Sequence, residues 1–152
     1  MFAALGRVPS GIFILTARRD RDETGLLSSW VQQCGFLPPQ VSVALRGDRF
    51  LADWLQEGAN FTLNILDDSQ TDMIVHFGKG FELGQDAFAG LEVSREESSA
   101  PVLLEALAYL NCRVTTRCSP GDHVLVIGQV VGGRMLNEGH PMVHIRKNGF
   151  HY

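Results

Sequence analysis

The stretch from Gly25 to Pro39 reads GLLSSWVQQCGFLPP, and it is the part of the chain that says most about the fold. It begins as a strand, because apolar and aromatic side chains dominate its first residues. Hydroxyls at Ser28 and Ser29 stand where a plain core strand would carry valine or isoleucine. The Phe-Leu-Pro-Pro end predicts a turn that leads directly into another strand.

This stretch also has the composition of a ligand-binding edge. Its two small hydroxyls precede the indole of Trp30, and Gly35 leaves backbone amides accessible a few residues later. Such a combination suits a flat polar ring that carries a phosphate tail, because the ring needs an apolar surface and the tail needs N–H donors.

Further strands are predicted on both sides of this stretch. Their apolar residues run continuously or alternate at the spacing of two that is typical of β-structure. The charged segment 18–24 predicts a solvated hairpin loop, and Gly132-Gly133 and Asn148-Gly149 predict two further hairpin turns. The predicted strands cover residues 11–17, 41–46, 60–66, 107–118 and 122–131.

Two short helices are expected between these strands. Asp48 is a favourable N-cap for residues 49–57, and Ser69 is one for residues 70–77. The apolar residues of the first helix share one face, which predicts core packing. Strands outnumber helices and no βαβ unit repeats, so we expect a mainly β fold, an antiparallel barrel with one or two covering helices.

The composition fits a single domain that spans residues 1–152. A chain of 152 residues with a hydrophobic fraction of 45% can bury a core and is not typical of disorder. No apolar run is long enough to cross a bilayer, and the N-terminus lacks the pattern of a signal peptide. We therefore expect a cytoplasmic protein without membrane insertion.

The charge of the chain bears on its partners. A net charge of −4, with lysine only at positions 79 and 147, weighs against nucleic acid, whose binding depends on phosphate neutralisation. A small phosphorylated ligand needs only one or two cations and some backbone N–H groups, so it is compatible with this composition.

The motifs of several enzyme classes do not occur. The sequence contains no GxGxxG that opens a helix, no GxxxxGK[ST] and no GxSxG. No histidine pair has zinc spacing, and Cys34, Cys112 and Cys118 lack the spacing of metal ligands. Buried or half-buried thiols are favoured over a redox role, and no metal site is predicted.

Three groups of polar residues remain at strand ends. Arg46 and Arg49 flank a Gly-Asp turn, where a phosphate would meet guanidinium and helix N–H groups; the alternative is a solvated, capped turn. Gly121-Asp122-His123 puts an imidazole near a barrel rim, or alternatively on a surface turn. His144 and Arg146 have strand spacing and share a face, which alone indicates little.

Taken in order, these segments resemble the flavin reductase-like family, the FMN-binding split-barrel domains. The SSWVQQ form of the serine-rich strand and the HIRKNGFHY ending are most similar to one branch, the C-terminal flavin reductase domain of diflavin-type flavodiiron proteins. The resemblance covers nearly the whole chain, through LGRVPSGIFILTA, GLLSSWVQQCGFLPPQVSVAL, ANFTLNIL, ALAYLNCRV, GDHVLVIGQVVGGRML and HIRKNGFHY.

The resemblance implies a Greek-key split β-barrel of about six strands with covering helices, paired into a homodimer that binds FMN near its interface. The implied reaction is hydride transfer from NADH or NADPH to flavin. In a full-length relative, the electrons would pass to a flavodoxin-like domain and a diiron domain that reduces oxygen. The chain would then be an excised domain or a stand-alone relative.

The resemblance also implies roles for individual residues. Arg46 and Arg49 match the region near the flavin phosphate, and His123 matches the nicotinamide side as the candidate catalytic residue. The strand expected to contact flavin carries Ser28, Ser29 and Trp30. The loop whose backbone would meet the ring edge carries Gln33, Cys34, Gly35 and Phe36.

The chain departs from the wider family at several polar positions. Leu26-Leu27 stands where many members have Met-Thr, Gly35 replaces a common serine, and Leu37 replaces a common aspartate. Phe50 stands where a small hydroxyl residue is common. Each change removes a side-chain hydrogen bond worth about 0.5–1.5 kcal/mol. A second hypothesis is therefore a catalytically weak FMN-binding or dimerisation module within a larger electron-transfer protein.

Overall fold

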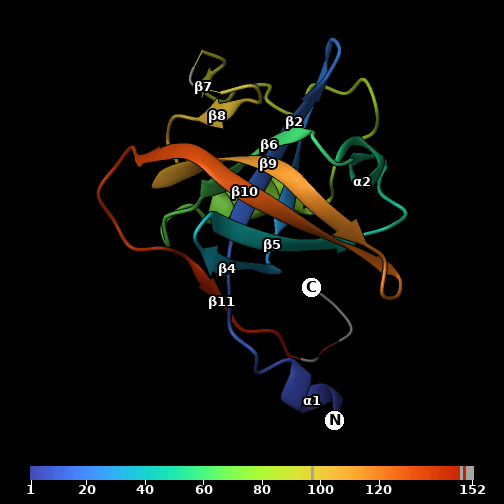
Figure 1. The fold of residues 1–152 in the computed structure, drawn as a ribbon. Helices are drawn as coiled ribbons and strands as arrows, with labels where there is room; N and C mark the ends of the chain where they lie inside the picture. The colour runs from blue at the N-terminus through green and yellow to red at the C-terminus, as the bar shows by residue number, and fades with distance from the viewer. Residues whose placement is uncertain (97, 148, 150–152) are drawn as a thin grey trace.

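The computed structural model describes residues 1–96, 98–147 and 149, and its centre is a seven-stranded antiparallel sheet (Figure 1). The strand order across this sheet is β3-β2-β6-β9-β10-β5-β4. Its strands are β2 (Phe13–Arg19), β3 (Asp22–Ser28), β4 (Val31–Phe36), β5 (Pro39–Arg46), β6 (Asn60–Ile65), β9 (Ala108–Cys118) and β10 (His123–Met135).

Shorter elements surround the sheet. Two small antiparallel pairs join β1 (Ser10–Gly11) to β11 (Val143–His144) and β7 (Val93–Ser94) to β8 (Val102–Leu103). The helices are α1 (Phe2–Leu5), α2 (Phe50–Trp54) and α3 (Thr71–Gly78). No helix in the described part of the chain is long and apolar enough to cross a membrane.

The sheet curls because its two edge strands are neighbours in the chain. Only Ser29 and Trp30 separate β3 from β4, which stand at opposite ends of the strand order. Such a link spans about 10 Å, whereas a flat sheet of this size would hold its edges roughly 29 Å apart. The Trp30 carbonyl accepts a hydrogen bond from the Ala44 N–H of β5 (2.9 Å). The expected mainly β split barrel is confirmed, with a seam between its two edges.

The curled sheet encloses an apolar core. Val41, Val43 and Leu45 point inward from β5 and are buried, as their alternation predicts. They belong to one cluster with Leu51 and Leu55 at α2. Full burial of each such side chain contributes about 1.5–3 kcal/mol, so this face holds the barrel together.

Polar side chains inside the sheet have partners. The Asn64 amide donates to the carbonyl of Ile14 (3.1 Å) and accepts from the N–H of Leu103 (2.8 Å). The Thr16 hydroxyl donates to the carbonyl of Pro101 (2.6 Å). These bonds hold the segment that contains β8 against the central strands β2 and β6.

The expected N-terminal hairpin loop is shorter than predicted. Instead of an open loop over 18–24, β2 and β3 continue until only Asp20 and Arg21 form the turn. Arg18 and Glu23 face each other across the strands and form an ion pair, and Arg95 joins them with its Nε 2.9 Å from Glu23 Oε2. The charged residues therefore pair along the strands instead of filling a loop.

Both predicted helix N-caps are wrong. The Asp48 carboxylate binds the Arg46 guanidinium (2.5 Å), so α2 begins after Arg49 without a side-chain cap and ends at Trp54. The Ser69 hydroxyl binds the Asp67 carboxylate (2.5 Å) and does not cap α3. In both places a nearby charged group competes for the side chain that would have capped the helix.

The expected turn at Gly132-Gly133 is also wrong. β10 runs through both glycines to Met135 and pairs with β9, with a register shift between Val130 and Gly132. Gly133 has φ +145°, and a Cβ there would lie 2.4 Å from the carbonyl oxygen of Tyr109. The glycines therefore allow a bulge inside a long strand. The turn predicted at Asn148-Gly149 includes Asn148, which lies outside the described residues.

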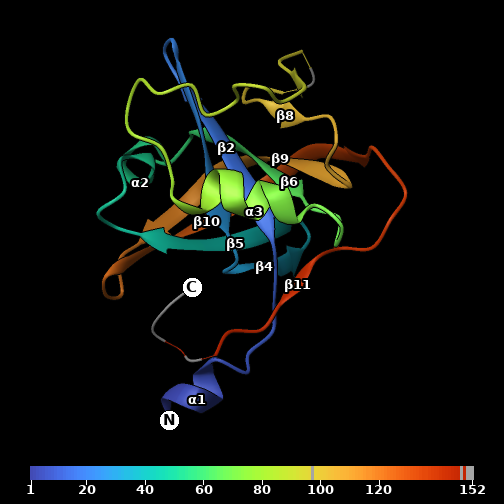
Figure 2. The ribbon, with the colours of Figure 1, turned by 180° about the vertical axis from the view of Figure 1, so that it is seen from behind.

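Gly25 of β3 lies where α3 packs tightly on the sheet, and the helix crosses outside the central strands (Figure 2). A Cβ at Gly25 would lie 2.5 Å from Cε1 of Phe77 and 3.4 Å from Cγ2 of Ile14. We expect Gly25→Ala to lower the free energy of unfolding by about 1–3 kcal/mol, because the added methyl overpacks this contact. Urea denaturation measures this loss.

Gly121→Ala is the matched control for this prediction, because nothing lies within 4 Å of the position of its Cβ. Its unfolding free energy should stay within about 0.5 kcal/mol of the unchanged chain. Equal losses in the two variants would contradict the tight packing of α3 on β3.

Candidate functional site

Two adjoining cavities open at the seam of the split barrel. The first, here the seam cavity, has a volume of about 310 Å³ and lies between the end of β3, the end of β5 and α3. The second, the rim cavity, has a volume of about 620 Å³ and lies where β10 begins. Ala44 and Arg46 line both cavities. Volumes of this size are typical of sites for small molecules.

The seam cavity is mainly apolar with a few polar groups. Its residues come from β3, the link, β5, α3 and β11, which are distant in sequence. They are Ile12, Leu26, Leu27, Ser28, Ser29, Ala44, Leu45, Arg46, Arg49, Ile74, Gly78 and His144.

The Ser29 hydroxyl in the wall of the seam cavity has no hydrogen-bond partner among the described residues. Ser28, which ends β3, and Ser29, which begins the link, are 5% and 7% exposed. The Ser29 Oγ is buried and forms no hydrogen bond within the described part of the chain. A buried hydroxyl without a partner is costly, so its position in a cavity wall suits a ligand that supplies one.

A cation without an internal partner lies on the same cavity. Arg46 is paired with Asp48, but Arg49 forms no ion pair or side-chain hydrogen bond among the described residues. The Arg49 guanidinium lies over Gly80, where a Cβ would be 2.7 Å from Nη1 and where φ is +75°. Arg49 is therefore half-buried against the loop after α3 and available to an anionic group.

The rim cavity carries an aromatic and cationic wall. The Trp30 and His123 ring centroids are 4.7 Å apart, and the Arg146 guanidinium carbon lies 5.0 Å from the Trp30 centroid. His123 Nδ1 lies 2.8 Å from Asp122 Oδ1 and donates to it, since an ionised carboxylate only accepts. This hydrogen bond, with the imidazole charge, lowers the pKa of Asp122. The same bond orients the His123 ring.

The other predicted flavin contacts lie elsewhere. Gln33, Cys34, Gly35 and Phe36 belong to β4, paired with β5, and not to a loop. None of them lines either cavity, and Phe36 is 85% exposed. The structure thus brings six of the predicted site residues to the two cavities and leaves four on an exposed edge strand. The six are Ser28, Ser29, Trp30, Arg46, Arg49 and His123.

Some lining residues could not be singled out from the sequence. Ile74 and Gly78 reach the seam cavity from α3, and no local pattern distinguishes them from ordinary core residues. The spacing of His144 and Arg146 predicts that they share a face. They line neighbouring cavities, His144 the first and Arg146 the second.

The cysteines do not form a site. Cys112 is buried in the barrel, and burial raises the pKa of its thiol to about 12, so it is inert. Cys34 and Cys118 are exposed, which differs from the expectation of buried or half-buried thiols. The described residues contain no group of three or more His, Cys, Asp or Glu side chains arranged to hold a metal ion.

Sequence comparison identifies relatives over almost the whole chain. The family model described as "Flavin reductase like domain" matches residues 5–151. Diflavin flavoprotein A 1 of Synechocystis is 40% identical over 151 residues, which cover 98% of this chain and 26% of that protein. Putative diflavin flavoprotein A 6 of Nostoc is 38% identical with the same coverage. The chain thus spans about a quarter of the length of these relatives.

Solved structures share the fold. The NADH:FAD oxidoreductase of Streptomyces globisporus superposes with a TM-score of 0.86 at 23% identity, covering 95% of this chain and 86% of that one. The styrene monooxygenase flavin reductase of Pseudomonas putida gives a TM-score of 0.78 at 24% identity, covering 94% and 90%. At this identity the likeness supports the split-barrel fold.

The unpartnered hydroxyl in the seam cavity yields a stability test. Ser29→Ala should change the free energy of unfolding of the ligand-free chain by less than about 0.5 kcal/mol, or raise it, because no hydrogen bond is lost. Thr16→Val removes a buried hydroxyl that has a partner and should cost about 1–3 kcal/mol. Thermal or urea unfolding compares the two; a larger loss for Ser29→Ala than for Thr16→Val would mean that the Ser29 hydroxyl has a structural partner.

Proposed function

The chain belongs to the flavin reductase-like domain family, and we propose that it is an NAD(P)H:flavin oxidoreductase domain that binds FMN in the seam cavity. The observation that carries the proposal is that Ser29 and Arg49 line the same apolar cavity, and that neither the Ser29 hydroxyl nor the Arg49 guanidinium has a partner among the described residues. A flavin mononucleotide offers a flat ring with hydrogen-bonding atoms and a dianionic tail, which match these two groups.

FMN, when bound, supplies the ring that accepts a hydride, and the protein supplies position and shielding. Leu26, Leu27 and Ile74 offer the ring an apolar wall that excludes water. Ser28 and Ser29 are the proposed polar contacts, and Arg49, assisted by Arg46, is the proposed phosphate ligand. The backbone around Cys34 and Gly35 lies in β4, which does not line this cavity, so it would contact FMN only after a rearrangement or from a second chain.

The rim cavity is the proposed site of the nicotinamide coenzyme. It adjoins the seam cavity through Ala44 and Arg46, so a ring bound in it would lie beside a ring bound in the other. His123, oriented by Asp122, and Trp30 form its wall and are proposed to position the nicotinamide. Hydride transfer needs close stacking of two rings, so positioning accounts for most of the protein's contribution.

A second chain is part of the proposal. Phe36 and Leu37 are 85% and 97% exposed at the end of β4, a free sheet edge. Exposed apolar side chains on an edge strand are typical of a surface covered by a partner. This observation supports a homodimer, and it also favours the second hypothesis, an FMN-binding or dimerisation module with weak catalysis.

The wider context is proposed from the relatives. They are named diflavin flavoproteins, and the chain matches about a quarter of their length. We infer that residues 1–152 form one domain of such a protein in the cytoplasm. Its partners would be a flavodoxin-like domain and a diiron domain that reduces oxygen.

Turnover separates the two functions. We expect the domain mixed with FMN to oxidise NADH or NADPH. The loss of nicotinamide absorbance measures this oxidation. Gel filtration in the same buffer measures whether it is a dimer. A folded dimer that binds FMN without oxidising either nicotinamide would contradict the oxidoreductase and support the module.

Arg49 should distinguish FMN from riboflavin, because only FMN carries a phosphate. Arg49→Ala is expected to weaken FMN binding about 10–100-fold, since a hydrogen bond to a charged group contributes about 1.5–3 kcal/mol. Riboflavin affinity should change less than about twofold. Flavin fluorescence quenching measures both, and Arg113→Ala, an exposed arginine outside both cavities, is the control. A matched loss for both flavins would remove Arg49 from the phosphate site.

A further inference from the structure

Arg146 is a buried cation whose hydrogen-bonding capacity the described chain leaves largely unfilled. Its residue is 7% exposed, and its Nε is buried without a hydrogen-bond partner. The one recorded side-chain bond runs from Nη2 to the carbonyl of Leu5 at 3.5 Å, which is long. A guanidinium has five donors and stays charged, so burying it with one weak bond is unfavourable unless an anion binds it.

The position of Arg146 is set by contacts from both ends of the chain. Its guanidinium carbon lies 5.0 Å from the centroid of the Trp30 ring, a cation–π distance. Leu5, whose carbonyl accepts from Arg146, ends α1, and the Gly149 N–H donates to the carbonyl of Phe2 in the same helix (2.9 Å). The segment after β11 is thereby held against α1, below β4 and β5 in Figure 1. Arg146 is held against the rim cavity by these contacts.

The other charged groups of the rim cavity are already paired. Arg46 pairs with Asp48, and His123 pairs with Asp122, whose side chain is 92% exposed. Arg146 forms no ion pair among the described residues. The cavity therefore contains one cation, next to an aromatic wall, whose charge nothing in the described chain neutralises.

We propose that Arg146 binds a backbone phosphate of the nicotinamide coenzyme in the rim cavity and so selects phosphorylated hydride donors. The inference rests on the proposed function, which assigns that cavity to NAD(P)H. The planar fork of a guanidinium matches phosphate oxygens in a bidentate manner, and contact with Trp30 orients it. The group bound is the phosphate on the nicotinamide ribose, which NADH, NADPH and the reduced mononucleotide share.

The test compares donors with and without a phosphate. Arg146→Met keeps most of the apolar length of the side chain and removes the charge, and N-benzyl-1,4-dihydronicotinamide is a hydride donor without phosphate. We expect Arg146→Met to lower kcat/KM by about tenfold or more for NADH, NADPH and reduced nicotinamide mononucleotide, mainly through KM. The rate with the benzyl donor should stay within about twofold.

Controls separate this role from a structural one. Lys147→Met removes a charge from the neighbouring, exposed residue and should leave kcat/KM unchanged for all donors. Arg146→Lys keeps the charge but not the planar fork of the guanidinium. Its kcat/KM for the phosphorylated donors should lie between those of the unchanged chain and Arg146→Met. Equal losses for the benzyl donor and the phosphorylated donors would overturn the proposal, because they would show that Arg146 acts only through packing on Trp30. A loss for NADPH alone would overturn it too, since it would point to the 2′-phosphate.

If no donor is oxidised, that result counts against the proposed function itself. A binding measurement then still tests the anion site at Arg146. The chain has two tryptophans, so Trp54→Phe leaves Trp30 as the single indole reporter beside Arg146. In the Trp54→Phe variant, binding of inorganic pyrophosphate should change Trp30 fluorescence in a saturable manner. In the double variant that also carries Arg146→Met, the affinity for pyrophosphate should be about tenfold or more lower. Equal pyrophosphate binding with and without Arg146, or no binding in either, would overturn the anion site.

Discussion

The two-residue link between β3 and β4 is the constraint on which the rest of the structure depends. Ser29 and Trp30 join the two edges of a seven-stranded sheet, so the sheet has to curl until the end of β3 lies near the start of β4. The hydrogen bond from Ala44 N–H to the Trp30 carbonyl pins the link to β5. A seam results, because β3 and β4 are joined at one end by the link but do not pair with each other.

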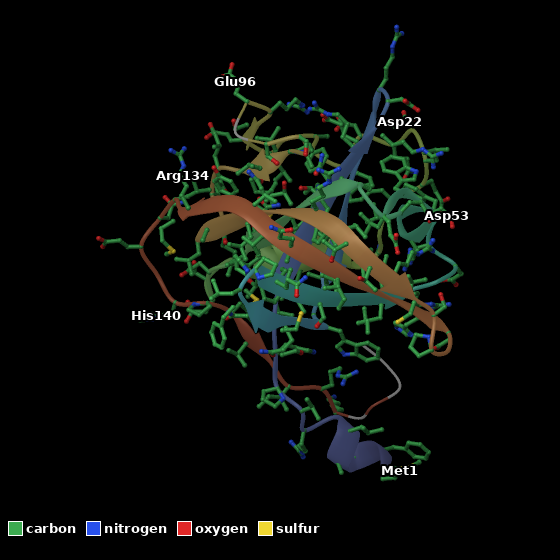
Figure 3. The ribbon with its side chains drawn as sticks, in the orientation of Figure 1. Met1, Asp22, Asp53, Glu96, Arg134 and His140 are labelled. Atoms are coloured by element: carbon green, nitrogen blue, oxygen red, sulfur yellow. The ribbon has the colours of Figure 1, made fainter. Side chains whose placement is uncertain are left out.

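The seam explains why both cavities lie where they do. Edge strands that are linked at one end without pairing leave space near the link, which side chains of the link and of β5 line. α3 and β11 cover the seam cavity, and Arg146 contributes to the rim cavity. The link itself carries the hydroxyl of Ser29 into one cavity and the indole of Trp30 into the other. Figure 3 shows the contrast: labelled charged residues such as Asp22 and Arg134 lie at the periphery, away from the seam.

Local competition decided the features that sequence patterns predicted wrongly. Asp48 and Ser69 have the right chemistry for N-caps, but Arg46 and the Asp67 carboxylate bind them instead. Gly132-Gly133 has the composition of a turn, yet pairing with β9 carries the strand through it as a bulge. At the two caps the competing group lies only two residues away in the chain. At Gly132-Gly133 the partner is a strand distant in sequence, which a propensity read from a few residues cannot include.

The sequence by itself determined the mainly β class and most of the strands, and it predicted a ligand-binding edge at residues 28–30. Periodicity and side-chain chemistry are local properties, so they can be read along the chain. Only the tertiary structure decided that Arg49 and Ser29 face one cavity, that β4 lies outside it, and that Arg146 is buried beside Trp30. Those relations depend on how the sheet curls and on where the two ends of the chain pack. Contacts between distant segments have no local pattern that records them.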